Sequence, residues 1–159
     1  MNFKKAVVTG SSGFIGKALV KKLISYNIEV VAVDRNPNTI NGCKSVVLDI
    51  THENVLDDYL SEDTVIFHVA AKASVPKSVL NPVADFNDTF FGMFQVLESA
   101  KKHRCKVIFP STASIFDIEN ALPVSERSFI KPSSPYGAAK ISGEAYCFAY
   151  FRCYNLDVR

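Results

Sequence analysis

The 159-residue sequence has no long hydrophobic run and almost no excess of charge. A membrane-spanning helix needs about 20 consecutive apolar residues, whereas the longest apolar run here extends only from Val65 to Ala71 and is interrupted by His68. Lys and Arg number 18 and Asp and Glu number 16, which leaves a formal net charge of +2. We therefore expect neither a membrane protein nor a nucleic-acid-binding protein.

The spacing of the four cysteines matches no metal or redox motif. The four cysteines form no Cys-x-x-Cys pair, and the three histidines are scattered. This pattern argues against a metal site and favours reduced thiols in a cytoplasmic protein. The first five residues resemble the start of a signal peptide, but only three apolar residues follow before Thr9, so we do not expect secretion.

Short apolar runs alternate with helical patterns along the chain. Five strands are predicted, at residues 4–9, 29–33, 45–48, 64–70 and 106–110. Helices are predicted at residues 14–26, 51–59, 82–103 and 134–154, with a polar loop over 117–132 and an extended segment from Leu156. Strands that are apolar on both faces are typical of parallel sheets, so we expect an α/β fold with a doubly wound parallel sheet.

A glycine turn joins the first predicted strand to the first predicted helix. Gly10 would allow the tight turn, Gly13 would let a diphosphate approach the backbone, and Gly16 would let the helix pack closely. Three glycines could also form a turn with no ligand. Asp34, at the end of the second strand, could bind both hydroxyls of an adenosine ribose, which favours NAD over NADP, although the neighbouring Arg35 weakens that preference.

A Walker loop is the competing phosphate-binding motif, and the spacing excludes it. Five residues separate Gly10 from Gly16 where that motif requires four, and Lys17 is followed by Ala18 instead of Ser or Thr. A dinucleotide therefore remains the better interpretation of the turn.

Tyr136 and Lys140 lie four residues apart in the last predicted helix and so share one face. A free phenol has a pKa of about 10, and we expect the nearby ammonium to lower it, which would suit proton transfer at a sugar hydroxyl. The same spacing also arises by chance on many helices. Thr112 adds a hydroxyl at the end of the fifth strand, at the carboxyl edge where ligands bind in such folds.

Six motifs, in this order, resemble those of the extended short-chain dehydrogenase/reductase family over residues 3–159. They are Thr9-Gly10-x-x-Gly13-Phe14-Ile15-Gly16, Asp34, Asp49-Ile50, His68-Val69-Ala70-Ala71, Ser111-Thr112 and Tyr136-x-x-x-Lys140. Within that family the chain is similar to NAD-dependent epimerase/dehydratases that act on nucleotide sugars. The resemblance implies a Rossmann fold truncated at its sixth strand, in which residues 1–159 form the NAD-binding domain and the C-terminal substrate domain is absent.

The resemblance also implies roles for individual residues. Tyr136 would be the catalytic acid and base, Lys140 would bind the nicotinamide ribose and the tyrosine, and Thr112 would be their hydroxyl partner. The further cofactor contacts that it implies are Gly10, Gly13, Phe14, Ile15, Gly16, Asp34, Arg35, Asp49, Ile50, Ala70, Ala71 and Thr89, the last of which stands where the family usually has Asn. The substrate contacts that it implies are Ser74, Thr112, Ser114 and Tyr136.

The residues after Thr112 help to choose a reaction. Dehydratases of the resembling family follow this Thr with an Asp-Glu pair, and decarboxylases have a Glu two residues after it, whereas this chain has Ala113 and Ser114. The 4-epimerases are similar in having a small residue and a hydroxyl here. The resemblance therefore implies NAD-dependent oxidation and re-reduction at C4 of a UDP-hexose. An NAD-binding fragment without turnover, or a dehydratase or reductase of the same family, remains the alternative.

Aromatic residues crowd the two long predicted helices. They are Phe86, Phe90, Phe91 and Phe94 in the first, and Tyr146, Phe148, Tyr150, Phe151 and Tyr154 in the second. Helices that are apolar on nearly all sides are expected to be buried on more than one side. Either these residues form core, or, as in the resembling family, residues 82–103 and 134–154 form a homodimer interface.

Overall fold

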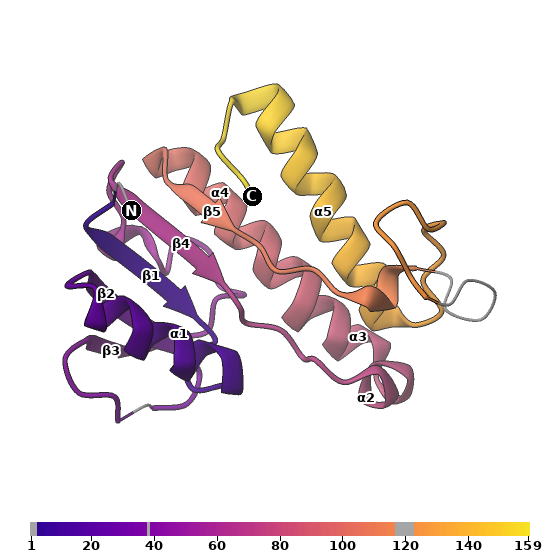
Figure 1. The fold of residues 1–159 in the computed structure, drawn as a ribbon, viewed down its shortest axis with the longest axis horizontal. Coiled ribbons are helices and arrows are strands. Elements are labelled where there is room, and N and C mark those ends of the chain that lie inside the picture. The colour runs from indigo at the N-terminus through magenta and orange to yellow at the C-terminus, as the bar shows by residue number, and fades with distance from the viewer. Residues whose placement is uncertain (1–2, 38, 117–122) are drawn as a thin grey trace.

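The fold is a parallel sheet with helices on both faces, seen in a computed structural model that describes residues 3–37, 39–116 and 123–159 (Figure 1). The strands are β1 (Lys5–Thr9), β2 (Glu29–Asp34), β3 (Lys44–Val47), β4 (Thr64–His68) and β5 (Lys106–Ile108). They pair in parallel in the order β3-β2-β1-β4-β5. The chain therefore reverses its direction of winding between β1 and β4, which confirms the predicted doubly wound sheet.

The helices begin and end close to the predicted positions in most places. They are α1 (Phe14–Ser25), α2 (Val75–Leu80), α3 (Pro82–Asp85), α4 (Gly92–His103) and α5 (Pro135–Tyr154), with a π-helix η2 (Phe86–Phe91) between α3 and α4 and 3-10 turns η1 (Asp57–Tyr59) and η3 (Ala113–Ile115). Helix α1 packs on β1 and β2, whereas α4 packs on β4 and β5 and also on α5. In Figure 1, α4 and α5 run side by side.

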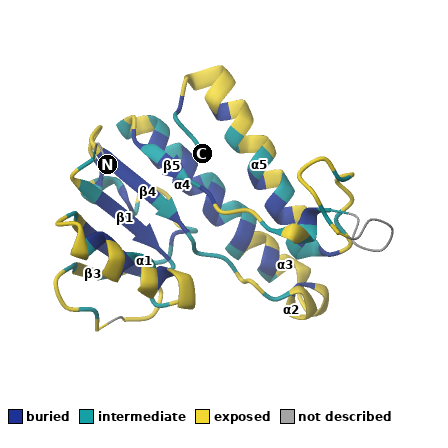
Figure 2. Cartoon of the chain, in the orientation of Figure 1, coloured by how far each residue is buried: buried dark blue, intermediate teal, exposed yellow. Residues whose placement is uncertain are grey.

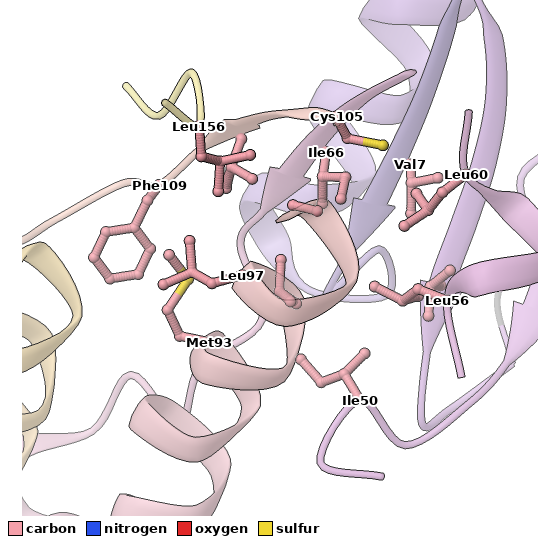
Figure 3. Packing of buried hydrophobic residues seen from close by; sticks show 14 of the residues in the cluster. Val7, Ile50, Leu56, Leu60, Ile66, Met93, Leu97, Cys105, Phe109 and Leu156 are labelled. Carbon is pink, nitrogen blue, oxygen red and sulfur yellow. The ribbon is translucent and has the colours of Figure 1, made fainter. Parts of the chain in front are cut away.

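Alternate residues of one strand enter two different cores. In β1, Ala6 and Val8 pack under α1, whereas Val7 belongs to the larger cluster beneath α4 and α5. Figure 2 shows β1 and β4 as buried strands, and Figure 3 shows Met93 and Leu97 of α4 inside the larger cluster. Because both faces of the sheet are covered, its strands read as continuous apolar runs.

Three segments differ from the sequence-based prediction. Residues 82–103 are helical throughout, but the π-helix at 86–91 was not predicted, and neither was α2. The helix predicted over 51–59 was wrong, because only η1 forms. The Asp49 carboxylate accepts hydrogen bonds from the backbone and hydroxyl of Thr51, and Asn54 has a φ of +59°, which no right-handed helix tolerates.

Two further predicted segments are the extended segment from Leu156 and the loop over 117–132. Val158 forms a parallel bridge to Val107, so the extended segment predicted from Leu156 does join the sheet beside β5. Part of the predicted loop over 117–132 falls on residues 117–122, which lie outside the described residues. Across the described ranges, no helix has the length and apolar character that crossing a membrane requires.

Candidate cofactor and active site

The carboxyl ends of the parallel strands bring most of the predicted site residues to one edge of the sheet. A cavity at this edge is lined by Gly10, Val33, Asp34, Arg35, Asn36, Leu48, Ile50, Ala70, Ala71, Lys72 and Asp88. Asp49 lines an adjoining depression. Ligands bind at this edge, beside the point where the strand order reverses, in open α/β sheets.

Close packing explains two of the three glycines in the turn. Gly10 has a φ of +71°, and a Cβ built on it would lie 2.7 Å from the backbone of Ala70. A Cβ on Gly16 would lie 2.1 Å from the carbonyl oxygen of Gly10. The backbone of Ser11 donates a hydrogen bond to the Val33 carbonyl at 3.1 Å, which ties the turn to β2.

The first turn of α1 is suited to a diphosphate. Gly13 is its N-cap, and within the described residues no side chain caps it, so its backbone N–H groups are available to an anion. Phe14 is 95% exposed and Ile15 is 60% exposed beside this end. Large apolar side chains left exposed next to uncapped donors fit a site that a dinucleotide would cover.

The Asp34 carboxylate is held firmly at the cavity wall. One of its oxygens accepts from the Ser12 backbone and the other from the Asn36 backbone, each at 2.9 Å. A carboxylate oxygen can accept more than one hydrogen bond. Asp34 can therefore accept further bonds from ribose hydroxyls without leaving its place.

A cluster of ion pairs lies at the end of the cavity beside Asp34. The Arg35 guanidinium lies 3.0 Å from an Asp49 oxygen and 2.6 Å from one Asp88 oxygen, and the Lys72 ammonium lies 3.0 Å from the other Asp88 oxygen. Burial acts to raise the pKa of Asp49, but the hydrogen bonds from Thr51 and Arg35 outweigh it and lower the pKa to about 2. Both carboxylates therefore remain ionised at neutral pH. No motif in the sequence indicated Asp88 or Lys72 for this role.

The Tyr136 phenol lies beside the Thr112 hydroxyl at the other end of the edge. Ser134 caps α5 by accepting from the Gly137 backbone at 3.1 Å, which places Tyr136 in the first helical turn. A Cβ on Gly137 would lie 2.4 Å from the Ser114 carbonyl oxygen, so only glycine lets α5 approach η3 this closely. The Thr112 hydroxyl lies close enough to the Tyr136 phenol to act on its pKa.

Lys140 is buried one turn further along α5 and does not act on Tyr136 as expected. Its ammonium donates to the Pro110 carbonyl at 2.5 Å and lies 3.9 Å from the centre of the Phe109 ring, and burial lowers its pKa to about 8. Burial also raises the pKa of Tyr136, although the Thr112 hydroxyl opposes the shift. The predicted lowering of the Tyr136 pKa by Lys140 is thus wrong for this arrangement, because the ammonium is engaged elsewhere.

Two buried titratable groups flank these residues: Asp85, which the sequence analysis did not name, and His68, which it named only as part of an apolar run and of a motif. Asp85 is 1% exposed, and neither of its carboxylate oxygens has a hydrogen-bond partner within the described ranges, so burial raises its pKa. The charge of Asp85 in turn raises the pKa of Tyr136. His68 bonds the Thr9 hydroxyl at 2.9 Å through Nδ1, and burial, assisted by the Lys140 charge, lowers its pKa to about 3.

Thr89 and Ser74 are among the expected site residues that lie outside the cavity lining. Thr89 is 1% exposed, and its hydroxyl accepts from the Lys72 backbone at 3.4 Å, so it orients the loop after β4. Ser74 is half-buried at the start of α2. Their predicted contacts with cofactor and substrate stay predictions.

Comparison with known proteins identifies the family to which the chain belongs. The model of the NAD dependent epimerase/dehydratase family matches residues 6–159. UDP-glucose 4-epimerase of Mycolicibacterium smegmatis is 32% identical over 168 residues, which cover 96% of this chain and 53% of that protein. UDP-glucuronic acid decarboxylase 1 of Xenopus tropicalis is 30% identical over 169 residues, which cover 98% of this chain and 39% of that protein.

A solved structure supports the same relation. UDP-glucose 4-epimerase of Thermus thermophilus, in complex with NAD, superposes with a TM-score of 0.88 at 29% identity. The match covers 97% of this chain and 53% of that one. The chain thus spans about half the length of the curated epimerases that it matches.

Proposed function

Because the chain belongs to the NAD dependent epimerase/dehydratase family, we propose that it carries the cofactor-binding and proton-transfer residues of a UDP-sugar 4-epimerase. The observation behind the proposal is the placement of the Tyr136 phenol beside the Thr112 hydroxyl, at the sheet edge that also holds the glycine turn. The substrate would be a UDP-hexose, and the reaction would invert the configuration at C4.

The residues at the glycine turn fit the family's cofactor, NAD. The diphosphate would lie against the uncapped first turn of α1, and Asp34 would accept hydrogen bonds from the adenosine ribose. Lys140 would bind the nicotinamide ribose. Bound there, NAD supplies a reversible hydride acceptor for C4 of the sugar.

Tyr136 would move the proton. As the phenolate it would accept the proton of the C4 hydroxyl, and as the phenol it would return that proton once the sugar has presented its other face. Thr112 would hydrogen-bond the same sugar oxygen, and Ser114 lies within the same turn, 3.3 Å from the Thr112 hydroxyl. Because η3 offers Ala113 and Ser114 instead of carboxylates, it supplies no acid or base for elimination of water or for decarboxylation.

A second candidate function is NAD binding without turnover. It is favoured by the Lys140 ammonium, which donates to the Pro110 carbonyl and is not among the groups that shift the Tyr136 pKa. A decarboxylase or dehydratase activity is the third, supported by the similarity to UDP-glucuronic acid decarboxylase 1 and opposed by the residues of η3.

A homodimer through residues 82–103 and 134–154 belongs to the same proposal. Aromatic contacts join these helices, with the Phe90 and Tyr146 ring centres 5.1 Å apart and the Phe94 and Tyr146 centres 5.9 Å apart. Several large apolar side chains of the two helices still face outward; they are Val83, Phe86, Tyr146, Phe148, Phe151 and Tyr154. A helical face of this kind supports a protein partner. A clean monomer at micromolar concentration in light scattering would contradict the dimer.

We also propose a cytoplasmic location. The four cysteines are free thiols, and Cys153 is exposed. Exposed reduced thiols persist in reducing compartments.

One assay separates the candidate functions. Purified chain with NAD is incubated with UDP-glucose, and UDP-galactose is measured, while NAD binding is measured by calorimetry. Interconversion supports the epimerase. NAD binding without any interconversion of UDP-hexoses or their N-acetyl forms would favour the second candidate, and release of carbon dioxide from UDP-glucuronic acid would favour the third.

A further inference from the structure

Two cationic side chains border the cavity at the adenosine end. Arg35 directly follows Asp34, and Lys72 lies in the loop after β4, and both contribute to the cavity lining. An arginine near this position is what accommodates the 2′-phosphate of NADP in dinucleotide-binding folds. On residue types alone, this end of the cavity could therefore receive either cofactor.

Both cations are engaged by a single carboxylate. One Asp88 oxygen lies 2.6 Å from Arg35 and the other lies 3.0 Å from Lys72. The Asp88 side chain is 16% exposed, against 44% for Arg35 and 50% for Lys72, so the carboxylate is the fixed member of the cluster. Asp49 holds Arg35 from the other side at 3.0 Å.

We propose that Asp88 is a specificity-determining residue for the cofactor: it holds Arg35 and Lys72 away from a 2′-phosphate and thereby favours NAD over NADP. With Asp34 and Asp49, the described cluster sets three carboxylates against two cations, so a 2′-phosphate meets an excess of negative charge. Asp34 acts by accepting the ribose hydroxyls. Asp88 acts separately, by neutralising the groups that would otherwise bind phosphate.

The position of Asp88 in the chain suits this role. It belongs to η2, where the helix is widened to a π-helix between α3 and α4. From there it reaches the residue after β2 and the loop after β4, two segments that are far apart in sequence. Burial acts to raise the pKa of Asp88, but the hydrogen bonds from Arg35 and Lys72 outweigh it and lower the pKa, so the carboxylate stays ionised at neutral pH.

Calorimetric titration with NAD and NADP tests the proposal on the chain itself. In Asp88→Asn, we expect the ratio of NADP affinity to NAD affinity to rise roughly three- to tenfold, which is the range expected for freeing a partly exposed ion pair. Asp57→Asn is the matched control, because the Asp57 side chain is 15% exposed and pairs with Lys102 away from the cavity. This control should leave the ratio unchanged.

Further variants make the test specific to the cations. Asp88→Ser should raise the ratio as Asp88→Asn does, whereas Asp88→Glu keeps the charge and should stay near the wild-type ratio. Adding Arg35→Gln to Asp88→Asn should remove most of the gain.

Three results would overturn the proposal. The first is an unchanged ratio in folded Asp88→Asn or Asp88→Ser chain. The second is an equal rise in Asp57→Asn, and the third is binding of neither cofactor by the wild-type chain. The proposal rests only on the NAD part of the proposed function. A chain that prefers NAD through Asp88 yet never interconverts UDP-hexoses would refute the epimerase and leave this inference standing.

Discussion

The two ends of the sheet edge handle charge in opposite ways. At the end beside Asp34, the charged side chains of Arg35, Lys72, Asp49 and Asp88 are partly exposed and form ion pairs. At the other end, burial shifts titratable groups towards their neutral forms, raising the pKa of Tyr136 and lowering that of Lys140 to about 8. The first arrangement suits binding of a charged ligand, whereas shifted pKa values are typical of groups that exchange protons.

A substitution in the glycine turn should cause the largest loss of folding stability. Gly16→Ala would place a Cβ 2.1 Å from the Gly10 carbonyl oxygen, and a backbone atom cannot yield as a flexible side chain can, so we expect a loss of about 3 kcal/mol in the free energy of unfolding. Gly13→Ala meets only a 3.2 Å contact and should fold, while weakening NAD binding by crowding the diphosphate. Urea denaturation and calorimetry measure the two effects. Equal stability losses in both variants would contradict this difference.

His68 predicts a pH dependence at the buried end. Its pKa is about 3 in the folded chain against 6.5 for the free side chain, so between these values the unfolded chain binds more protons. Stability therefore falls as the pH drops, by about 1.5 kcal/mol between pH 6.5 and pH 5 for this group. His68→Asn should remove that part of the slope, whereas replacing the exposed His52 by Asn should keep it. A wild-type slope in His68→Asn would show that another group is responsible.

Asp85 and Asp88 lie three residues apart, and their replacement by asparagine should change the stability of the folded chain in opposite directions. Because the pKa of Asp85 is raised by burial, ionised Asp85 destabilises the folded chain above that pKa, so Asp85→Asn should stabilise it by about 1 kcal/mol at pH 7. The gain should vanish as the pH falls below the raised pKa. Asp88→Asn should cost up to about 1 kcal/mol, since it breaks partly exposed ion pairs. Denaturation curves at several pH values measure both, and changes of the same sign would contradict the comparison.

The sequence was sufficient to place residues whose position depends only on where a strand ends. The glycine turn, Asp34 and the hydroxyl of Thr112 each follow directly from a strand end, and parallel strands bring their ends to one edge. Gly137 is different, because glycine is required there by the close approach of α5 to η3, which is a tertiary contact.

Sequence reasoning failed where a contact depends on helical register. A π-helix shifts every later side chain around the helix axis, so a regular period could not show that Asp88 faces the cavity and that Thr89 is buried. The helix wrongly expected over 51–59 failed through side-chain competition, because Asp49 bonds the backbone of Thr51. The Lys140 ammonium likewise has a partner, the Pro110 carbonyl, that only the tertiary structure reveals.

We propose that Tyr136 transfers the proton in a UDP-hexose 4-epimerase, and the turnover of a Tyr136→Phe chain bears directly on this claim. With NAD saturating, we predict NAD affinity close to that of the wild type and a rate of UDP-glucose to UDP-galactose conversion lower by roughly 10²–10⁴. Tyr26→Phe, at an exposed tyrosine after α1, is the control and should keep the wild-type rate. A Tyr136→Phe chain that interconverts the two sugars at the wild-type rate would contradict the claim.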